Sequence, residues 1–95
     1  MTDAPLPAQN PQVLFTEVDD GSGVLLHLDT KFYYTLNPTA VLVWKALAAE
    51  EPRPIAAIAL ELTRAFRVEL AEAEADVLRI VDEMLADGLV VERRG

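Results

Sequence analysis

Few side chains in this sequence could carry out covalent or acid–base chemistry. The chain has one histidine, His27, one serine, Ser22, and no cysteine. A Ser–His–acid triad would need Ser22 and His27, but both lie in or beside the same predicted hairpin. A zinc site would take nearly all of its ligands from carboxylates, and no glycine-rich phosphate loop is present. We therefore expect a binding or scaffolding module that is not an enzyme and uses no metal or cofactor.

The charge balance restricts the partners of the chain. Its 95 residues include 16 acidic and 8 basic ones, which gives a formal net charge of -8. Binding to nucleic acid or to an anionic membrane surface needs a surplus of Lys and Arg, so neither partner is expected. No apolar run approaches the roughly 18 residues of a membrane span, and residues 1–11 do not resemble a signal peptide. The expected location is the cytoplasm.

The length and the first half of the chain predict a small domain that starts with a sheet. Residues 1–12 are rich in proline and are expected to be a flexible lead-in, followed by one domain over residues 13–95. Runs of β-formers separated by turn residues indicate an antiparallel meander. We predict its strands over residues 13–18, 24–28 and 31–36.

Helical spacing of apolar residues dominates the second half. Three helices are predicted, with Asn37 as the N-cap of the first, Pro54 at the start of the second, and the third over about 71–87. Gly88 is expected to end the third helix in a left-handed conformation. The predicted fold class is α+β: a three-stranded antiparallel sheet followed by three α-helices, in a winged-helix-turn-helix-like arrangement.

The third predicted strand has the composition of an unprotected sheet edge. Over residues 31–36 the only charge is on Lys31, at the start. Edges are usually blunted by charge, proline or a bulge, because a free row of main-chain groups invites another strand. The aromatic residues of this strand therefore either pack on the helices or belong to an edge that accepts a guest strand.

The third predicted helix has a broader apolar face than a core needs. At 100° per residue its apolar side chains span an arc of roughly 160°, whereas burial against a core needs about 100°. The surplus is either additional core or the lining of a groove. A stripe of mostly acidic residues beside Ile80 is either a solvated face or a means of selecting a basic partner. The apolar residues are Leu70, Ala73, Val77, Leu78, Ile80, Val81, Met84 and Leu85, and the stripe is Glu72, Asp76, Arg79, Glu83 and Asp87.

This helix is poorly suited to reading DNA. A recognition helix presents Arg, Lys, Asn or Gln to the bases, and here Arg79 is the only basic residue among many acids. A winged-helix DNA-binding regulator is nevertheless one alternative to a module that accepts a guest strand. A dimerisation module whose open strand pairs with its own copy, giving a homodimer, is the other.

The ordered set of residues resembles the PqqD-like family. A hydrophobic strand is followed by Asp29, then by a Tyr-Tyr-x-Leu-Asn motif over residues 33–37, and then by Trp44 in the first helix. The pattern continues with Asp-Val-Leu at 76–78 and Gly-Leu-Val at 88–90. Together these segments extend the resemblance from about residue 13 to residue 91.

The resemblance implies a non-catalytic recognition element for ribosomally synthesised and modified peptides. Such proteins have a winged-helix-like fold and bind the leader segment of a precursor peptide as an additional strand between the third strand and the third helix. They present it to a modifying enzyme, such as a radical SAM protein in quinone biosynthesis or a leader peptidase in lasso-peptide systems. Quinone-pathway members have Pro-Glu where this chain has Asp29-Thr30, so the resemblance is nearer to lasso-type and other stand-alone members.

The resemblance also implies which residues bind the peptide. The guest strand is expected to pair with the backbone of residues 31–35, from Lys31 to Thr35. The expected groove floor is Phe32, Tyr33, Tyr34, Val77, Ile80, Val81 and Met84. The expected polar contacts at its edge are Asp76, Arg79 and Glu83.

Overall fold

The structure is a computed structural model that describes residues 6–48 and 53–92. Its larger sheet has the order β2-β3-β4, and the three helices follow it in the sequence, so the predicted α+β class is confirmed. The strands of this sheet are β2 (Val13–Glu17), β3 (Gly23–His27) and β4 (Tyr33–Leu36). The helices are α1 (Pro38–Ala46), α2 (Ile55–Phe66) and α3 (Leu70–Ala86).

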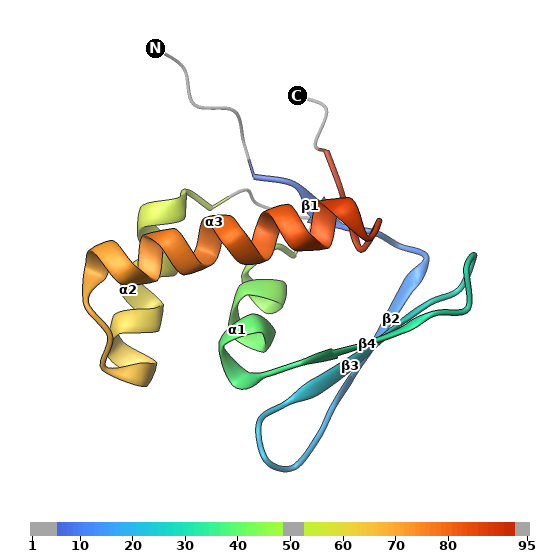
Figure 1. The fold of residues 1–95 in the computed structure, drawn as a ribbon, viewed down its shortest axis with the longest axis horizontal. Helices are drawn as coiled ribbons and strands as arrows, with labels where there is room; N and C mark the ends of the chain where they lie inside the picture. Colours follow the sequence, from blue (N-terminus) through green and yellow to red (C-terminus); the bar gives the residue numbers. More distant parts are fainter. Residues whose placement is uncertain (1–5, 49–52, 93–95) are drawn as a thin grey trace.

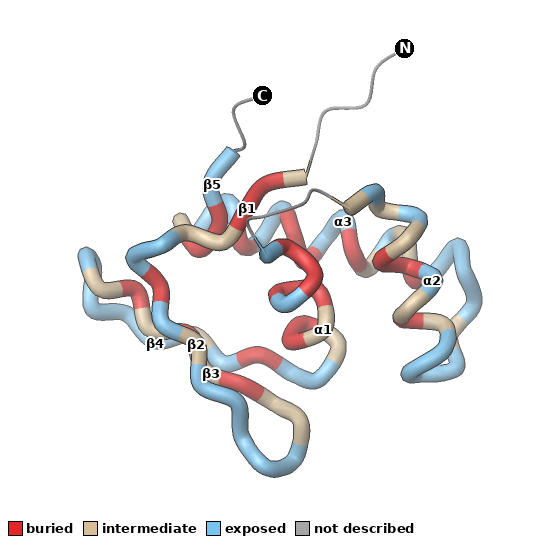
Figure 2. Tube along the Cα trace, turned by 180° about the vertical axis from the view of Figure 1, so that it is seen from behind, coloured by how far each residue is buried: buried red, intermediate tan, exposed pale blue. Residues whose placement is uncertain are grey.

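The helices and the sheet share one core. In Figure 1, α3 crosses above α1, α2 packs at the end of the molecule away from the sheet, and β4 leads directly into α1. Leu25 from the sheet, Val43 from α1, Ile58 from α2 and Val77 from α3 are each fully buried. Buried positions alternate along β3 and recur along each of the three helices (Figure 2). This is the pattern expected when alternate strand residues and one helical face pack inward.

Two helix ends have the capping residues that the sequence predicts, Asn37 before α1 and Gly88 after α3. Asn37 Oδ1 accepts a hydrogen bond from the Ala40 N–H at 2.8 Å, which satisfies one free donor of α1. Gly88 has a φ of 72°, and the Leu89 N–H reaches back to the Met84 carbonyl at 2.9 Å, closing α3 with a Schellman motif. Neither α2 nor α3 has a side-chain cap at its N-terminus. No helix of the described segments combines the length and the apolar character needed to traverse a bilayer.

The expectation of a flexible lead-in is wrong for residues 6–12. Within them, β1 (Ala8–Gln9) pairs antiparallel with β5 (Val90–Val91). The Gln9 side chain also donates to the Trp44 carbonyl at 2.7 Å, and the Asn10 side chain to the Gly88 carbonyl at 2.9 Å. These contacts join the start of the chain to α1 and to the end of α3. Residues 1–5 lie outside the described segments.

The third strand is also shorter than the expected 31–36. It starts at Tyr33, because the chain before it forms a longer turn in which Lys31 has a φ of 67°. The Lys31 N–H donates to the His27 carbonyl at 2.7 Å and so closes this turn. A glycine would adopt the left-handed conformation at lower cost, but here a lysine occupies it.

Candidate functional site

β4 forms one edge of the larger sheet, and the hydrogen bonds of β3 show how its main chain is oriented. The His27 N–H donates to the Phe32 carbonyl, on the β4 side, at 3.0 Å. In an antiparallel pair, bonded positions recur at every second residue, so Leu25 also directs its main-chain groups toward β4. The register places Tyr34 opposite Leu25. Tyr34 therefore bonds inward, to β3.

Tyr33 and Thr35 consequently point their N–H and C=O groups away from the sheet. Within residues 6–48 and 53–92, no main-chain hydrogen bond from outside the sheet reaches either residue. Each offers one donor and one acceptor, and the two are separated by a single residue, which is the repeat of an antiparallel or parallel ladder. The edge therefore has the hydrogen-bonding groups that a further strand needs.

A cleft lies beside this edge, between β4 and the second half of α3. Its volume is about 190 Å³. The floor is apolar, because Leu36, Ile80 and Met84 are buried in it, while charged residues of α3 lie at its rim. The complete lining is Tyr34, Thr35, Leu36, Asn37, Ala40, Arg79, Ile80, Glu83, Met84, Asp87 and Leu89.

The cleft brings together half of the predicted site residues. Those that line it are Tyr34, Thr35, Arg79, Ile80, Glu83 and Met84. The sequence-based selection omitted five further lining residues: Leu36, Asn37, Ala40, Asp87 and Leu89. Asp87 belongs to the acidic stripe that the sequence shows beside Ile80. Its position in that stripe could therefore have identified it as a residue of the cleft. Leu36, Asn37 and Ala40 continue the third strand into α1.

The other predicted site residues lie outside the cleft lining. Lys31 and Phe32 are in the turn before β4, and Tyr33 is exposed at its start. Val77 and Val81 are 0% and 3% exposed because they face the core, and neither contributes to the surface of the cleft. Asp76 also lies outside the lining. Its carboxylate forms an ion pair with a residue that lines the cleft.

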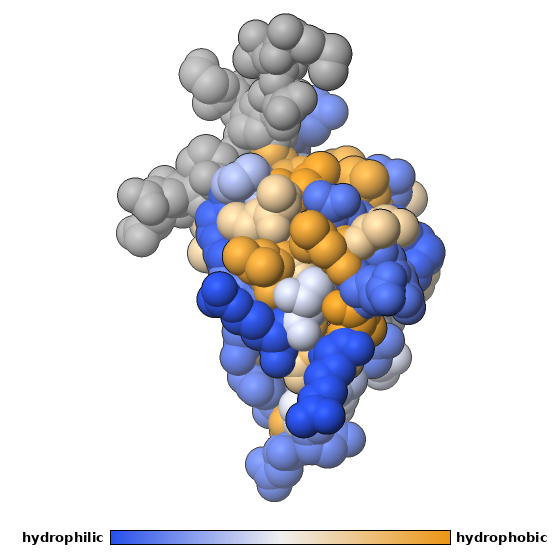
Figure 3. Space-filling view, turned by 90° about the vertical axis from the view of Figure 1, so that its left-hand side faces the viewer, coloured by the Kyte–Doolittle hydropathy of each residue, from blue (hydrophilic) through white to orange (hydrophobic). Residues whose placement is uncertain are grey.

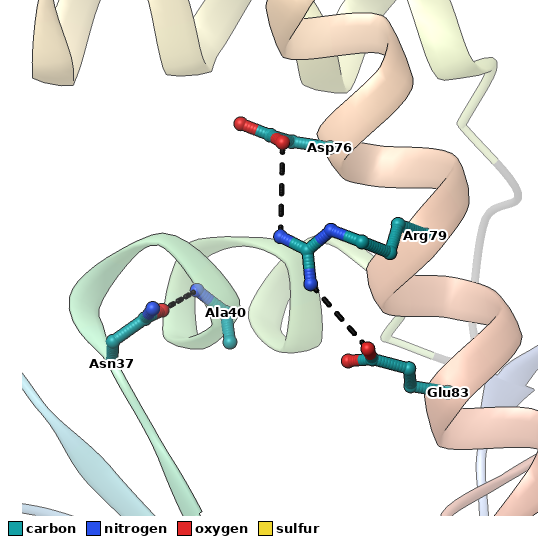
Figure 4. A network of polar contacts seen from close by, with 5 residues as sticks. All are labelled: Asn37, Ala40, Asp76, Arg79 and Glu83. Atoms are coloured by element: carbon teal, nitrogen blue, oxygen red, sulfur yellow. Dashed lines mark hydrogen bonds and ion pairs between the residues drawn. The ribbon is translucent and has the colours of Figure 1, made fainter.

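Arg79 is the cleft-lining residue that pairs with Asp76, and it is held between two carboxylates of its own helix. Its guanidinium lies 3.7 Å from Asp76 and 3.4 Å from Glu83. Figure 4 shows this network facing the start of α1, where Asn37 caps the helix. Arg79 is 57% exposed, so the network lies at the mouth of the cleft and not in its floor.

The surplus apolar residues of α3 line neither the core nor the cleft. Leu70, Leu78 and Leu85 are exposed, with Leu70 and Leu78 both at 48%. Figure 3, which views the end of the molecule formed by α2 and the start of α3, shows apolar residues gathered there beside strongly hydrophilic ones. The two sequence-based explanations of the wide arc, extra core and groove lining, are therefore both wrong for these three leucines.

Comparison with known proteins identifies the family. A family model described as "Coenzyme PQQ synthesis protein D (PqqD)" matches residues 22–90. The chain belongs to the PqqD family. The matched segment runs from the start of β3 to β5 and so includes every element that lines the cleft. No curated protein matches the sequence.

Two solved structures are similar to this PqqD-family chain. One is TbiB1 in complex with the TbiA(beta) leader peptide, with a TM-score of 0.77 and 22% identity over 93% of this chain and 99% of that one. The other is lasso peptide synthetase B1 complexed with the leader peptide, with a TM-score of 0.77 and 28% identity over 90% of this chain and 98% of that one. The family expected from the residue pattern is thus confirmed, and the same fold recurs in both structures.

Proposed function

We propose that this chain binds the leader segment of a ribosomally synthesised precursor peptide and presents it to a modifying enzyme. The observation that carries the proposal is the position of the free main-chain groups of Tyr33 and Thr35, directly beside an apolar cleft. Membership of the PqqD family supports it, as does the similarity to two proteins described as complexes with leader peptides.

The guest binds by β-augmentation. Its main chain pairs with Tyr33 and Thr35, and these hydrogen bonds are independent of the guest sequence. Alternate guest side chains enter the cleft, where they contact Tyr34, Ile80 and Met84. The main chain therefore supplies affinity for any extended segment, and the cleft selects apolar side chains at every second position.

The chain itself supplies no catalysis in this proposal and acts as an adaptor. The partner enzyme we propose is a leader peptidase of a lasso-peptide pathway, with a radical SAM enzyme of a quinone-type pathway as the alternative. The similarity to lasso peptide synthetase B1 supports the first, as does Asp29-Thr30 in place of Pro-Glu. We also retain the cytoplasm as the expected location.

The charges of α3, the helix that would contact DNA in a winged-helix regulator, do not favour the DNA-binding alternative. Arg79, the basic residue of α3, already faces Asp76 and Glu83, so it has little free charge for a phosphate. Self-pairing through β4 uses the same free groups as the guest, so it would compete with peptide binding. Light scattering with and without peptide separates the two, because the guest should dissociate any dimer formed through β4.

A pair of tyrosine variants tests the proposal. The first step is to read the open reading frames adjacent to the gene for this chain and identify a short precursor gene. The probe is then a fluorescent synthetic peptide with the leader sequence of that precursor. Tyr34→Ala removes an aromatic wall of the cleft and should weaken binding by about tenfold. Tyr33→Ala, a matched change on the same strand but outside the cleft lining, should change the affinity by less than about threefold because the main-chain bonds of Tyr33 remain.

Circular dichroism confirms that both tyrosine variants are folded before their affinities are compared. Equal losses in the two variants, or no saturable binding of the leader by the unmodified chain, would contradict the proposal. Binding of a DNA duplex at low salt in place of the leader would favour the regulator instead.

A further inference from the structure

The cleft is electrostatically different at its two ends. Three of its lining residues are charged, namely Arg79, Glu83 and Asp87. The positive charge of Arg79 is matched by Asp76 and Glu83 on its own helix, at 3.7 and 3.4 Å. Among the described residues, the arginine end of the cleft therefore has no unpaired positive charge to offer a guest.

The end of α3 carries negative charge that the described residues do not balance. Asp87 follows Glu83 by four positions, so the two carboxylates are neighbours on the helix surface and repel each other. The C-terminus of a helix adds partial negative charge, and the last turn of α3 has no basic residue. Across residues 6–48 and 53–92, no ion pair involves Asp87. A cation near the last carbonyls of a helix is the stabilising arrangement.

This acidic end lies where a guest strand would pass. Figure 1 shows that α3 ends on the side of the molecule where β4 begins, and Tyr34 near that end also lines the cleft. Figure 4 shows Arg79 near the other end, beside Asn37 and the start of α1. A strand added to β4 therefore runs past Arg79 at one end and past Asp87 at the other.

We propose that the guest peptide carries a Lys or Arg side chain that enters the cleft at the end of α3 and contacts Glu83 and Asp87. This inference rests on the proposed addition of a leader strand to β4 and specifies one side chain of that leader. A cation at this position relieves the repulsion between the two carboxylates and balances the helix terminus. Asp87 is then a specificity-determining residue, and Arg79 does not oppose the guest cation because its own charge is already paired.

Peptide selection tests the chemistry of the guest directly. The probe is a display library of random peptides about 14 residues long, enough for one strand with its flanks, selected on the immobilised full chain. The enriched peptides should share alternating apolar residues and a basic residue at one fixed position. Selection on the Asp87→Lys variant should remove that preference and enrich Asp or Glu at the same position.

Affinity measurements with one selected peptide compare Asp87→Asn with a control variant that makes the same charge change outside the cleft. Asp87→Asn should weaken its binding by about fivefold at low salt, and less at high salt, because the lost contact is an ion pair near the surface. The same variant should raise the midpoint of thermal unfolding, since it removes repulsion from the free protein. Asp82→Asn makes the same charge change on α3 outside the cleft and should leave the affinity within about 1.5-fold of the unmodified chain.

The outcomes separate this inference from the proposed function. Enriched peptides with alternating apolar residues but no basic preference would overturn the inference and leave leader binding intact. An acidic preference at that position would also overturn it, because Arg79 would then determine the choice. If neither the library nor the encoded leader yields a binding peptide, both proposals fail.

Discussion

The two edges of the larger sheet are protected to different degrees. β2 carries Glu17, whose carboxylate pairs with Lys45 of α1 at 2.6 Å. β4 has no charged residue from Tyr33 to Leu36 and adjoins an apolar cleft. Charge on an edge strand discourages the addition of another strand, so the sheet has one guarded edge and one open edge. β4 can therefore accept a further strand because of its own uncharged sequence and the cleft beside it, and not because every edge of this sheet is unprotected.

The largest expected effect comes from blocking the open edge. Thr35→Pro removes an outward N–H that the fold itself does not use, and the proline ring obstructs an incoming strand. Leader affinity should fall by about tenfold or more, since more than one hydrogen bond is lost. Fluorescence anisotropy with the labelled leader measures the change.

Glu17→Pro is the matched control on the guarded edge. The Glu17 N–H also points away from β3, so the substitution blocks an edge in the same way but far from the cleft. Affinity should stay within about twofold of the unmodified chain, because this edge does not receive the guest. Similar losses in both proline variants would mean that the two edges do not differ as we describe.

The next effect concerns how β4 is held in place. β4 leads directly into α1, and Asn37 at the junction caps that helix. Asn37→Ala should lower the free energy of unfolding by about 1 kcal/mol, and Asn37→Asp should restore most of it because a carboxylate also caps. Urea denaturation followed by circular dichroism measures both. An alanine variant as stable as the unmodified chain would show that the cap does not stabilise this junction.

Loss of the ion pair on the guarded edge should have a smaller effect. Both partners of the Glu17–Lys45 pair are about half exposed. Lys45→Met should therefore destabilise the fold by less than about 1 kcal/mol, and the difference should shrink as salt screens the pair. Thermal unfolding at low and high ionic strength checks this. A loss above about 2 kcal/mol would mean that the pair supports the fold and does not merely place charge on the edge.

The smallest effect is expected in the turn that joins β2 to β3. The Ser22 hydroxyl and then the Ser22 N–H donate to Asp20, and they hold the pKa of this carboxyl below its usual range. A lowered pKa stabilises the fold at pH values above the unfolded pKa, and this contribution is lost as the pH falls through the folded pKa. Ser22→Ala should raise the pKa of Asp20 toward the usual value, as measured by NMR titration of its side chain. An unchanged titration would show that the hydroxyl is not responsible.

Much of the fold follows from local sequence signals. Runs of β-forming residues separated by turn residues predicted β2 and β3, and Asn37 and Gly88 predicted two helix ends, because these features depend on near neighbours. β1 and β5 did not follow in the same way. Each has two residues, too few for a periodicity, and their position depends on contacts such as that of Gln9 with Trp44, 35 residues away.

The candidate site was predictable in part for the same reason. The composition of the third strand predicted an edge, and the strand order agrees with it. The sequence could not show which flank of α3 faces β4, because the rotation of a helix depends on how it packs in the core. Val77 and Val81 are buried, which turns Glu83 and Asp87 toward the cleft and leaves Leu78 exposed.

Amide hydrogen exchange at the two edges tests the central claim most directly. Tyr33 and Thr35 on β4, and Phe15 and Glu17 on β2, have N–H groups that point away from the sheet. On addition of the leader peptide, we predict strong protection of the Tyr33 and Thr35 amides and unchanged exchange at Phe15 and Glu17. Saturable binding that leaves the Tyr33 and Thr35 amides unprotected would contradict the account.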